Sequence, residues 1–185
     1  MARFDLAFSS LTLSLLYIAG TAIATTTTTS IEEACKATRY PAVCVETLQA
    51  HATDPQPSLQ ALAETTLSAG IAKIKQAKTF VSQMTNGKGL SANEHAALKD
   101  CFDGMGDGLD QLTQSVPELR KMGRTKVETF CGIKAMFKLG DCYEDSDEPT
   151  ALNGSIKSAI RGHVEPAAQV ISNALALVNQ LQQGH

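Results

Sequence analysis

Two cysteines enclose a short segment near the N-terminus, Cys35-Lys-Ala-Thr38-Arg-Tyr40-Pro41-Ala-Val-Cys44, and Leu48 follows it. Proline disfavours a helical conformation at the residue before it but suits the first turn of a new helix. The segment therefore predicts two short helices that meet in a bend at Tyr40 and Pro41. Such a hairpin brings Cys35 and Cys44 within the Cα separation that a disulfide needs. Because disulfides persist in oxidising compartments, the pair also predicts an exported protein.

Residues 1–24 have the parts of a secretory signal peptide. Arg3 supplies the positive charge, an apolar stretch covers residues 6–18, and Ala22-Ile23-Ala24 resembles a cleavage site. A membrane anchor fits less well, because Asp5 flanks the stretch and Ser and Thr dilute a run too short to span a bilayer. Residues 25–30 lack apolar periodicity and are expected to form a disordered mature N-terminus. We therefore expect a secreted, extracellular protein.

The composition excludes some classes of partner. The chain has 185 residues and a net charge of −3, from 16 basic and 19 acidic side chains. This length suits one domain with a real core. Mild acidity argues against nucleic acid and against membrane surfaces, which both favour patches of Lys and Arg. Asn153-Gly154-Ser155 is an N-glycosylation sequon, which would suit the surface of a secreted protein.

Helix boundaries can be predicted from capping residues. Ser58 is a suitable N-cap for a helix that continues to about Asn86. The segment Ser91-Ala-Asn-Glu94 is a capping box that opens the next helix. Because Ser115-Val-Pro-Glu118 has the same form, it predicts a separate short helix there.

Helical periodicity continues to the C-terminus, and strand signals are almost absent. Two further long helices are expected over about residues 125–143 and 151–181. We therefore predict an all-α domain over residues 31–183. Residues 31–52 would form the disulfide-stapled helical hairpin, and residues 58–183 an up-down-up-down four-helix bundle.

Five cysteines leave one thiol unpaired. If Cys35 bonds Cys44, then Cys101 can bond Cys131 or Cys142. The turn between the second and third bundle helices is expected near Leu119. Measured along the helix axes from this turn, the position of Cys101 would differ from that of Cys142 by roughly 7 Å and from that of Cys131 by roughly 9 Å. This small difference gives only a modest preference for Cys142 over Cys131.

Three segments resemble the plant invertase and pectin methylesterase inhibitor family. The first is the opening segment, which has the family's C-x-x-T-x-Y-P-x-x-C spacing. The second runs from Leu98 to Leu112 and is similar to L-x-D-C-x-E-x-Y-x-D-A-V-D-x-L, with Asp103 in place of Glu and Met105 in place of Tyr. The third, Ser172-Asn-Ala-Leu-Ala-Leu177, is similar to the family's S-N-A-L-A-L tail.

The resemblance implies a non-catalytic protein of the plant apoplast or cell wall. Such a protein would form a one-to-one complex with a pectin methylesterase or an invertase and cover the active-site cleft of that enzyme. It also implies a disulfide between Cys101 and Cys142, with Cys131 as a free thiol packed beside Phe130 and Ile133. Whether the protein forms a homodimer is left open by the sequence.

The target enzyme is harder to predict. Of the Pro-Lys-Phe loop of invertase inhibitors, this chain retains only Lys126. Methylesterase inhibitors have a T-W-x-S-A-A-L segment followed by Thr-Cys. This chain offers Thr129-Phe130, then Ala135-Met136, and Asp141 before Cys142. More of the second pattern is kept, so pectin methylesterase is the favoured target and invertase the alternative.

Three carboxylates mark a candidate contact surface. Asp103, Asp107 and Asp110 are spaced i, i+4 and i+7, so they share one face of a helix. They form either an ordinary solvated face or an acidic surface for a basic enzyme cleft. The resemblance favours a contact surface, because acidic positions of this helix contact the target in methylesterase inhibitors.

No motif predicts catalysis, a metal or a cofactor. The four histidines are scattered, without H-E-x-x-H or C-x-x-C spacing, and no G-x-S-x-G is present. The segment from Asp103 to Gly108 imitates part of a calcium loop, but Gln114 stands where that loop needs a glutamate. A different class of function, a secreted bundle that holds a small apolar ligand, is a further hypothesis. A third is the inhibitor-like pro-region of a larger methylesterase, which the chain end at His185 disfavours.

Overall fold

The structure is a computed structural model that describes residues 30–121, 142 and 152–183. The helices in these ranges are α2 (Ile31–Lys36), α3 (Pro41–His51), α4 (Leu59–Thr85), α5 (Ala92–Lys121) and α7 (Gly154–Gln183). Every regular element in these ranges is a helix, so the predicted all-α class is confirmed. The helix predicted over residues 125–143 lies outside the described residues, apart from Cys142.

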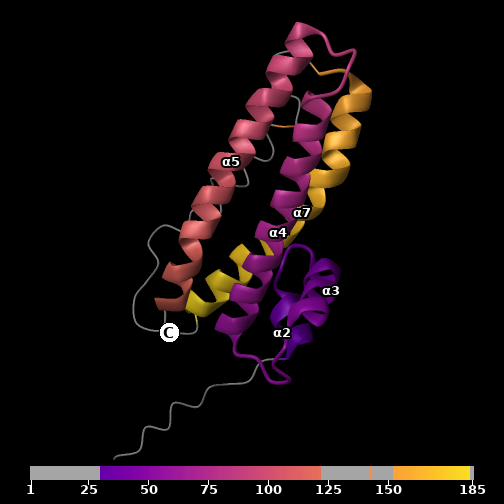
Figure 1. Ribbon diagram of the computed structural model, residues 1–185. Helices are drawn as coiled ribbons and strands as arrows, with labels where there is room; N and C mark the ends of the chain where they lie inside the picture. Colours follow the sequence, from indigo (N-terminus) through magenta and orange to yellow (C-terminus); the bar gives the residue numbers. More distant parts are fainter. Residues whose placement is uncertain (1–29, 122–141, 143–151, 184–185) are drawn as a thin grey trace, which may run out of the picture.

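The three long helices form an elongated bundle with α4 in contact with both of its neighbours (Figure 1). Helices α5 and α7 both run in the direction opposite to α4, as an up-down-up-down order requires of the second and fourth members. The hairpin of α2 and α3 packs against α4 and α7 near one end of the bundle. No helix in the described ranges is long and apolar enough to cross a membrane.

The core consists of the apolar positions that the helical spacing predicts. Each of the three long helices buries a stripe of aliphatic side chains that recur at three- and four-residue steps. The largest fully buried side chains on these helices are Leu62, Leu67, Ile74, Leu98, Met105, Leu112, Leu119, Ile160, Ile171 and Leu177. Burial of a leucine or isoleucine side chain contributes about 1.5–3 kcal/mol, so these stripes hold the long helices together.

One glycine allows α4 and α7 to pack closely. A Cβ added at Gly70 of α4 would lie only 2.8 Å from Cγ1 of Ile171 on α7. Both residues are buried. The crossing of the two helices therefore depends on the absence of a side chain at residue 70.

The predicted N-caps of α4 and α5 are confirmed. The hydroxyl of Ser58 accepts a hydrogen bond from the backbone N–H of Ala61 (3.2 Å). At the start of α5, the hydroxyl of Ser91 accepts from the N–H of Glu94 (3.2 Å), and the Glu94 carboxylate accepts from the N–H of Ser91 (2.9 Å). The backbone before this box turns at Gly89, whose φ of 94° is readily adopted only by glycine.

The second predicted capping box does not form, and the short helix predicted there is wrong. Helix α5 continues through Ser115 and Pro117 as far as Lys121. The Ser115 hydroxyl donates to the carbonyl of Gln111 (2.9 Å) in the preceding turn. Because Leu112 and Leu119 are buried on the same face of the helix, their packing keeps this segment helical despite the local signal.

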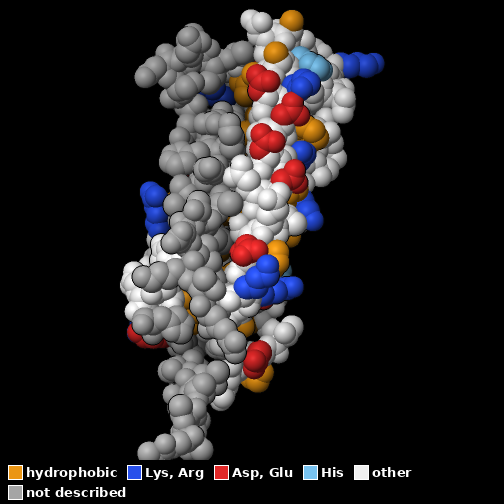
Figure 2. Space-filling model, turned by 90° about the vertical axis from the view of Figure 1, so that its left-hand side faces the viewer, with side chains coloured by type: hydrophobic (Ala, Val, Ile, Leu, Met, Phe, Trp, Pro, Cys, Tyr) orange, Lys and Arg blue, Asp and Glu red, His pale blue; other side chains and the backbone are white. Residues whose placement is uncertain are grey.

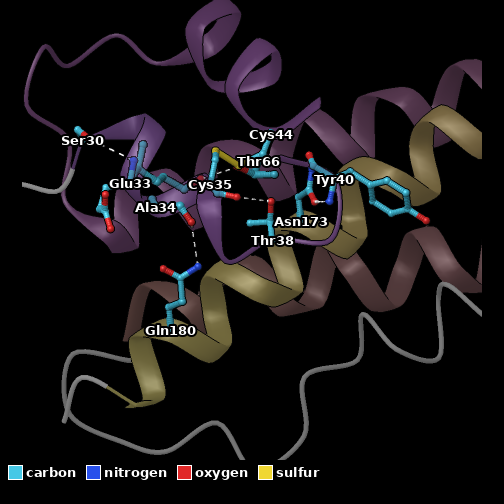
Figure 3. The surroundings of a disulfide bond; sticks show 11 residues. Ser30, Glu33, Ala34, Cys35, Thr38, Tyr40, Cys44, Thr66, Asn173 and Gln180 are labelled. Atoms are coloured by element: carbon cyan, nitrogen blue, oxygen red, sulfur yellow. Dashed lines mark hydrogen bonds between the residues drawn. A yellow bond between two sulfur atoms is a disulfide. The ribbon is translucent and has the colours of Figure 1, made fainter. Parts of the chain in front are cut away.

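The predicted hairpin is also confirmed, and it contains the first disulfide. Pro41 occupies the first turn of α3, and the Cα atoms of Cys35 and Cys44 lie 5.7 Å apart. The Thr38 hydroxyl closes the bend by donating to the carbonyl of Cys35 (2.7 Å). Both half-cystines are fully buried, so the staple lies inside the hairpin (Figure 3).

Two polar side chains of α7 attach this hairpin to the bundle. The amide of Asn173 pairs with the backbone of Tyr40, and the amide of Gln180 donates to the carbonyl of Ala34 at the end of α2 (2.9 Å). Figure 3 shows both side chains pointing from α7 into the hairpin. The hairpin is therefore fixed to α7 by side-chain to backbone hydrogen bonds as well as by packing.

A second disulfide joins α5 to the chain beyond it. Cys101 on α5 is bonded to Cys142, with their Cα atoms 4.9 Å apart. Both cysteines are buried. The bond connects positions 41 residues apart, so it ties Cys142 back onto α5.

Candidate target-binding surface

The outer face of α5 carries a line of aspartates. Asp103, Asp107 and Asp110 are all exposed, and Asp100 extends the line by one further turn. These four residues are called the acidic row here. They lie on the side of the helix away from its buried stripe of Leu98, Met105 and Leu112. Figure 2 shows acidic side chains following one another along this side of the molecule.

Only one member of the acidic row forms an ion pair with another described residue. The ammonium of Lys99 contacts the carboxylate of Asp103 (2.7 Å), and this hydrogen bond raises the pKa of Lys99. Within residues 30–121, 142 and 152–183, Asp100, Asp107 and Asp110 have no such partner. At Asp107 and Asp110 the row therefore presents negative charge that no ion pair with a described residue neutralises.

A lysine from α4 lies next to α5 in a space that a glycine leaves open. Nζ of Lys78 lies 4.1 Å from the ring centroid of Phe102, and a Cβ at Gly106 would come within 2.5 Å of the same atom. The cation is attracted by the face of the aromatic ring. At Gly106, therefore, the missing side chain gives room to a neighbouring ammonium group.

Four predicted residues lie outside the described part of the chain. Lys126, Thr129 and Asp141 were expected at the interface, and Cys131 was expected as a free thiol. The described candidates, Asp103, Asp107 and Asp110, share one face of one helix. Asn153 is exposed and directly precedes α7, which begins at the same end of the bundle as α5.

Sequence reasoning missed two kinds of residue. Asp100 belongs to the acidic row, and the 3-4-3 spacing from Asp100 to Asp110 could have revealed it. Asn173 and Gln180 hold the hairpin, and the signal for Asn173 was a polar residue among Val170, Ile171, Ala174 and Leu177 on an apolar face. A buried amide in such a position needs hydrogen-bond partners, which here come from Tyr40.

The described residues offer no grouping for metal chemistry. In those ranges, no three or more His, Cys, Asp or Glu side chains are placed to hold a metal ion. The acidic row runs along the exposed side of α5 over about three turns, so its carboxylates do not converge on one point. Such a surface can attract a cationic partner over several turns.

Comparison with known proteins supplies the family. Residues 29–177 match the family described as plant invertase/pectin methylesterase inhibitor. This chain belongs to that family. As a member, it is an enzyme inhibitor of this type and not a catalyst.

Individual relatives agree with the family match. "Pectinesterase inhibitor 9" of Arabidopsis thaliana is 36% identical over 163 residues, which cover 81% of this chain and 79% of the relative. A "21 kDa protein" of Daucus carota is 34% identical, and the match covers 93% of each chain. A mutant form of a pectin methylesterase inhibitor from Arabidopsis has the same fold. Its TM-score is 0.61 at 20% identity, over 78% of this chain and 92% of that one.

Proposed function

We propose that this inhibitor acts on a pectin methylesterase, in a one-to-one complex that covers the active-site cleft of the enzyme. The observation that carries the proposal is the family match over residues 29–177 together with relatives named as pectinesterase inhibitors. The signal peptide expected over residues 1–24 would deliver the protein to the extracellular space. Invertase inhibition is the alternative within the same family.

The acidic row is the proposed docking surface. Like charges three or four residues apart on a helix destabilise it by about 0.2–0.5 kcal/mol per pair. Asp107 and Asp110, unlike Asp103 with its ion pair to Lys99, therefore contribute nothing to the stability of α5 that neutral side chains would not supply. Contact with a cationic cleft would relieve this repulsion and speed the encounter between the two proteins.

The rigidity of α5 supports the same role. Its inner face is fixed by the buried stripe, and the disulfide to Cys142 anchors the helix two residues before Asp103. Asp103 is further held by its ion pair with Lys99. A preorganised surface loses less conformational entropy on binding than a mobile one.

Two enzyme assays on the purified protein test the target assignment. Inhibition should be measured on one purified pectin methylesterase and on one cell-wall invertase, over mildly acidic pH. We expect inhibition of the methylesterase, with an end point at equal molar amounts when the enzyme is titrated. Inhibition of the invertase alone would contradict the assignment, and an end point far from equality would contradict the stoichiometry.

A further inference from the structure

We propose that Asn153 carries an N-linked glycan in the secreted protein. The sequence Asn153-Gly154-Ser155 has the form that the glycosylation machinery accepts, with no proline at the middle position. All three residues are exposed, and they lie where the chain enters α7. The proposal rests on the expected export of the chain and not on the identity of the inhibited enzyme.

The hydrogen bonds of Asn153 leave room for the modification. Its Oδ1 accepts from the N–H of Ile156 (3.0 Å) and from the hydroxyl of Ser155 (2.6 Å). Its Nδ2 donates to Oε1 of Glu94 on α5 (2.6 Å). A side-chain amide has two N–H hydrogens, and this contact uses one of them. A sugar can therefore replace the other hydrogen while the cap of α7 and the bond to Glu94 persist.

The space around the sequon is open as well. A Cβ added at Gly154 would meet no atom of the described residues within 4 Å. A bulky, hydrophilic glycan needs such a surface position. The sequon thus combines an accessible nitrogen with free space beside the backbone.

The chemical step is a transfer from a lipid-linked donor. Nδ2 of Asn153 attacks C1 of the first sugar of an oligosaccharide carried on a polyprenyl diphosphate. The bond between C1 and the phosphate oxygen breaks, and the lipid diphosphate leaves with the electron pair. Nδ2 gives up one proton, so the product keeps one N–H.

The glycan would be attached beyond the end of the acidic row. Glu94, which accepts a hydrogen bond from Asn153, lies six residues before Asp100, the nearest member of the row, which is about 9 Å along the axis of α5. The root of the sugar would therefore sit at the end of the bundle. Inhibition should be the same with and without the glycan.

The test uses the full chain expressed in a eukaryotic secretory host. Three versions are compared: the unchanged chain, Ser155→Ala and Ser155→Thr. Ser155→Ala removes the hydroxyl that the transferase needs but retains the bonds from Asn153 to Ile156 and Glu94. Ser155→Thr is the matched control, because it keeps the hydroxyl.

The readout is mass spectrometry of the peptide that contains residue 153, before and after digestion with a peptide N-glycosidase. We expect a glycan at Asn153 in the unchanged chain and in Ser155→Thr, and a bare asparagine in Ser155→Ala. A bare Asn153 in the unchanged chain, from cells or medium, would overturn the proposal. Methylesterase assays on the same samples test the proposed function separately, since a glycosylated but inactive protein would contradict only that function.

Discussion

The buried side chain of Asn173 pairs with both backbone groups of Tyr40. Its Oδ1 accepts from the N–H of Tyr40 (3.0 Å), and its Nδ2 donates to the carbonyl of Tyr40 (2.9 Å). Tyr40 belongs to the opening segment, and Asn173 to the Ser-Asn-Ala-Leu tail 133 residues later. Two of the three segments that resemble the family are therefore in direct contact.

Replacing Asn173 by alanine should weaken the attachment of the hairpin to α7. Two hydrogen bonds are lost, and the N–H of Tyr40 is left without its protein partner, whereas the Tyr40 carbonyl still accepts from the N–H of Cys44 (2.9 Å). We expect the free energy of unfolding to fall by about 1–3 kcal/mol. Urea denaturation of the variant and the unchanged chain measures this difference. Asn179→Ala, at an exposed position of the same helix, is the control and should change stability by less than about 0.5 kcal/mol. Equal effects of the two substitutions would contradict the role given to Asn173.

Two glycine-to-alanine substitutions should have different effects. At Gly70 the new Cβ would overlap Ile171 in the core, and overpacking of this kind costs about 1–3 kcal/mol. At Gly106, the described atoms that it would meet belong to the flexible end of Lys78, which can move away. Alanine also favours a helix over glycine by about 1 kcal/mol. Thermal unfolding should therefore show a lower midpoint for Gly70→Ala and an equal or higher one for Gly106→Ala. A higher midpoint for Gly70→Ala would show that α4 and α7 can separate freely.

Glu94 should make the protein sensitive to acid. The backbone N–H and the hydroxyl of Ser91 hold the pKa of Glu94 below its ordinary value, and the amide of Asn153 adds to the effect. A carboxylate with a lowered folded pKa stabilises the fold above its unfolded pKa of about 4.3. The stabilisation by Glu94 is therefore lost as the pH falls below its unfolded pKa of about 4.3 and then through the lower pKa that Glu94 has in the folded protein.

Urea denaturation between pH 7 and pH 3 tests this expectation. The Glu94→Gln variant should be less stable than the unchanged chain at pH 7, and the difference should shrink below pH 4. Glu165→Gln, at an exposed position on α7, serves as the control. A difference that stays constant over the whole pH range would exclude the role of the Glu94 charge.

Local signals predicted much of this fold because they act over a few residues. Proline at position 41, serine at positions 58 and 91, and the aliphatic spacing each determine a boundary or a buried face nearby. The box at Ser115 misled the prediction, since burial of Leu112 and Leu119 outweighed its capping signal. Periodicity alone predicts where a helix can pack, and tertiary contacts decide where it ends.

The remaining features depend on contacts between distant parts of the chain. Helix lengths gave nearly equal mismatches for the two possible partners of Cys101, so the geometry favoured Cys142 only modestly and the resemblance was needed to predict the pair. Nothing near Asn173 in the sequence identifies Tyr40 as its partner. For the candidate surface, the aspartate spacing predicted the shared face of α5. It could not predict that Lys99 pairs with Asp103 while Asp107 has no described partner.

The most direct test of the acidic row compares inhibition of a pectin methylesterase by the unchanged chain, Asp107→Lys and Glu165→Lys. Both variants change the net charge equally, but only Asp107 belongs to the row. The inhibition constant should be measured at low and high salt. The account predicts that Asp107→Lys weakens inhibition about tenfold or more and flattens its salt dependence, while Glu165→Lys stays near the unchanged chain. Equal inhibition by all three proteins at both salt concentrations would contradict it.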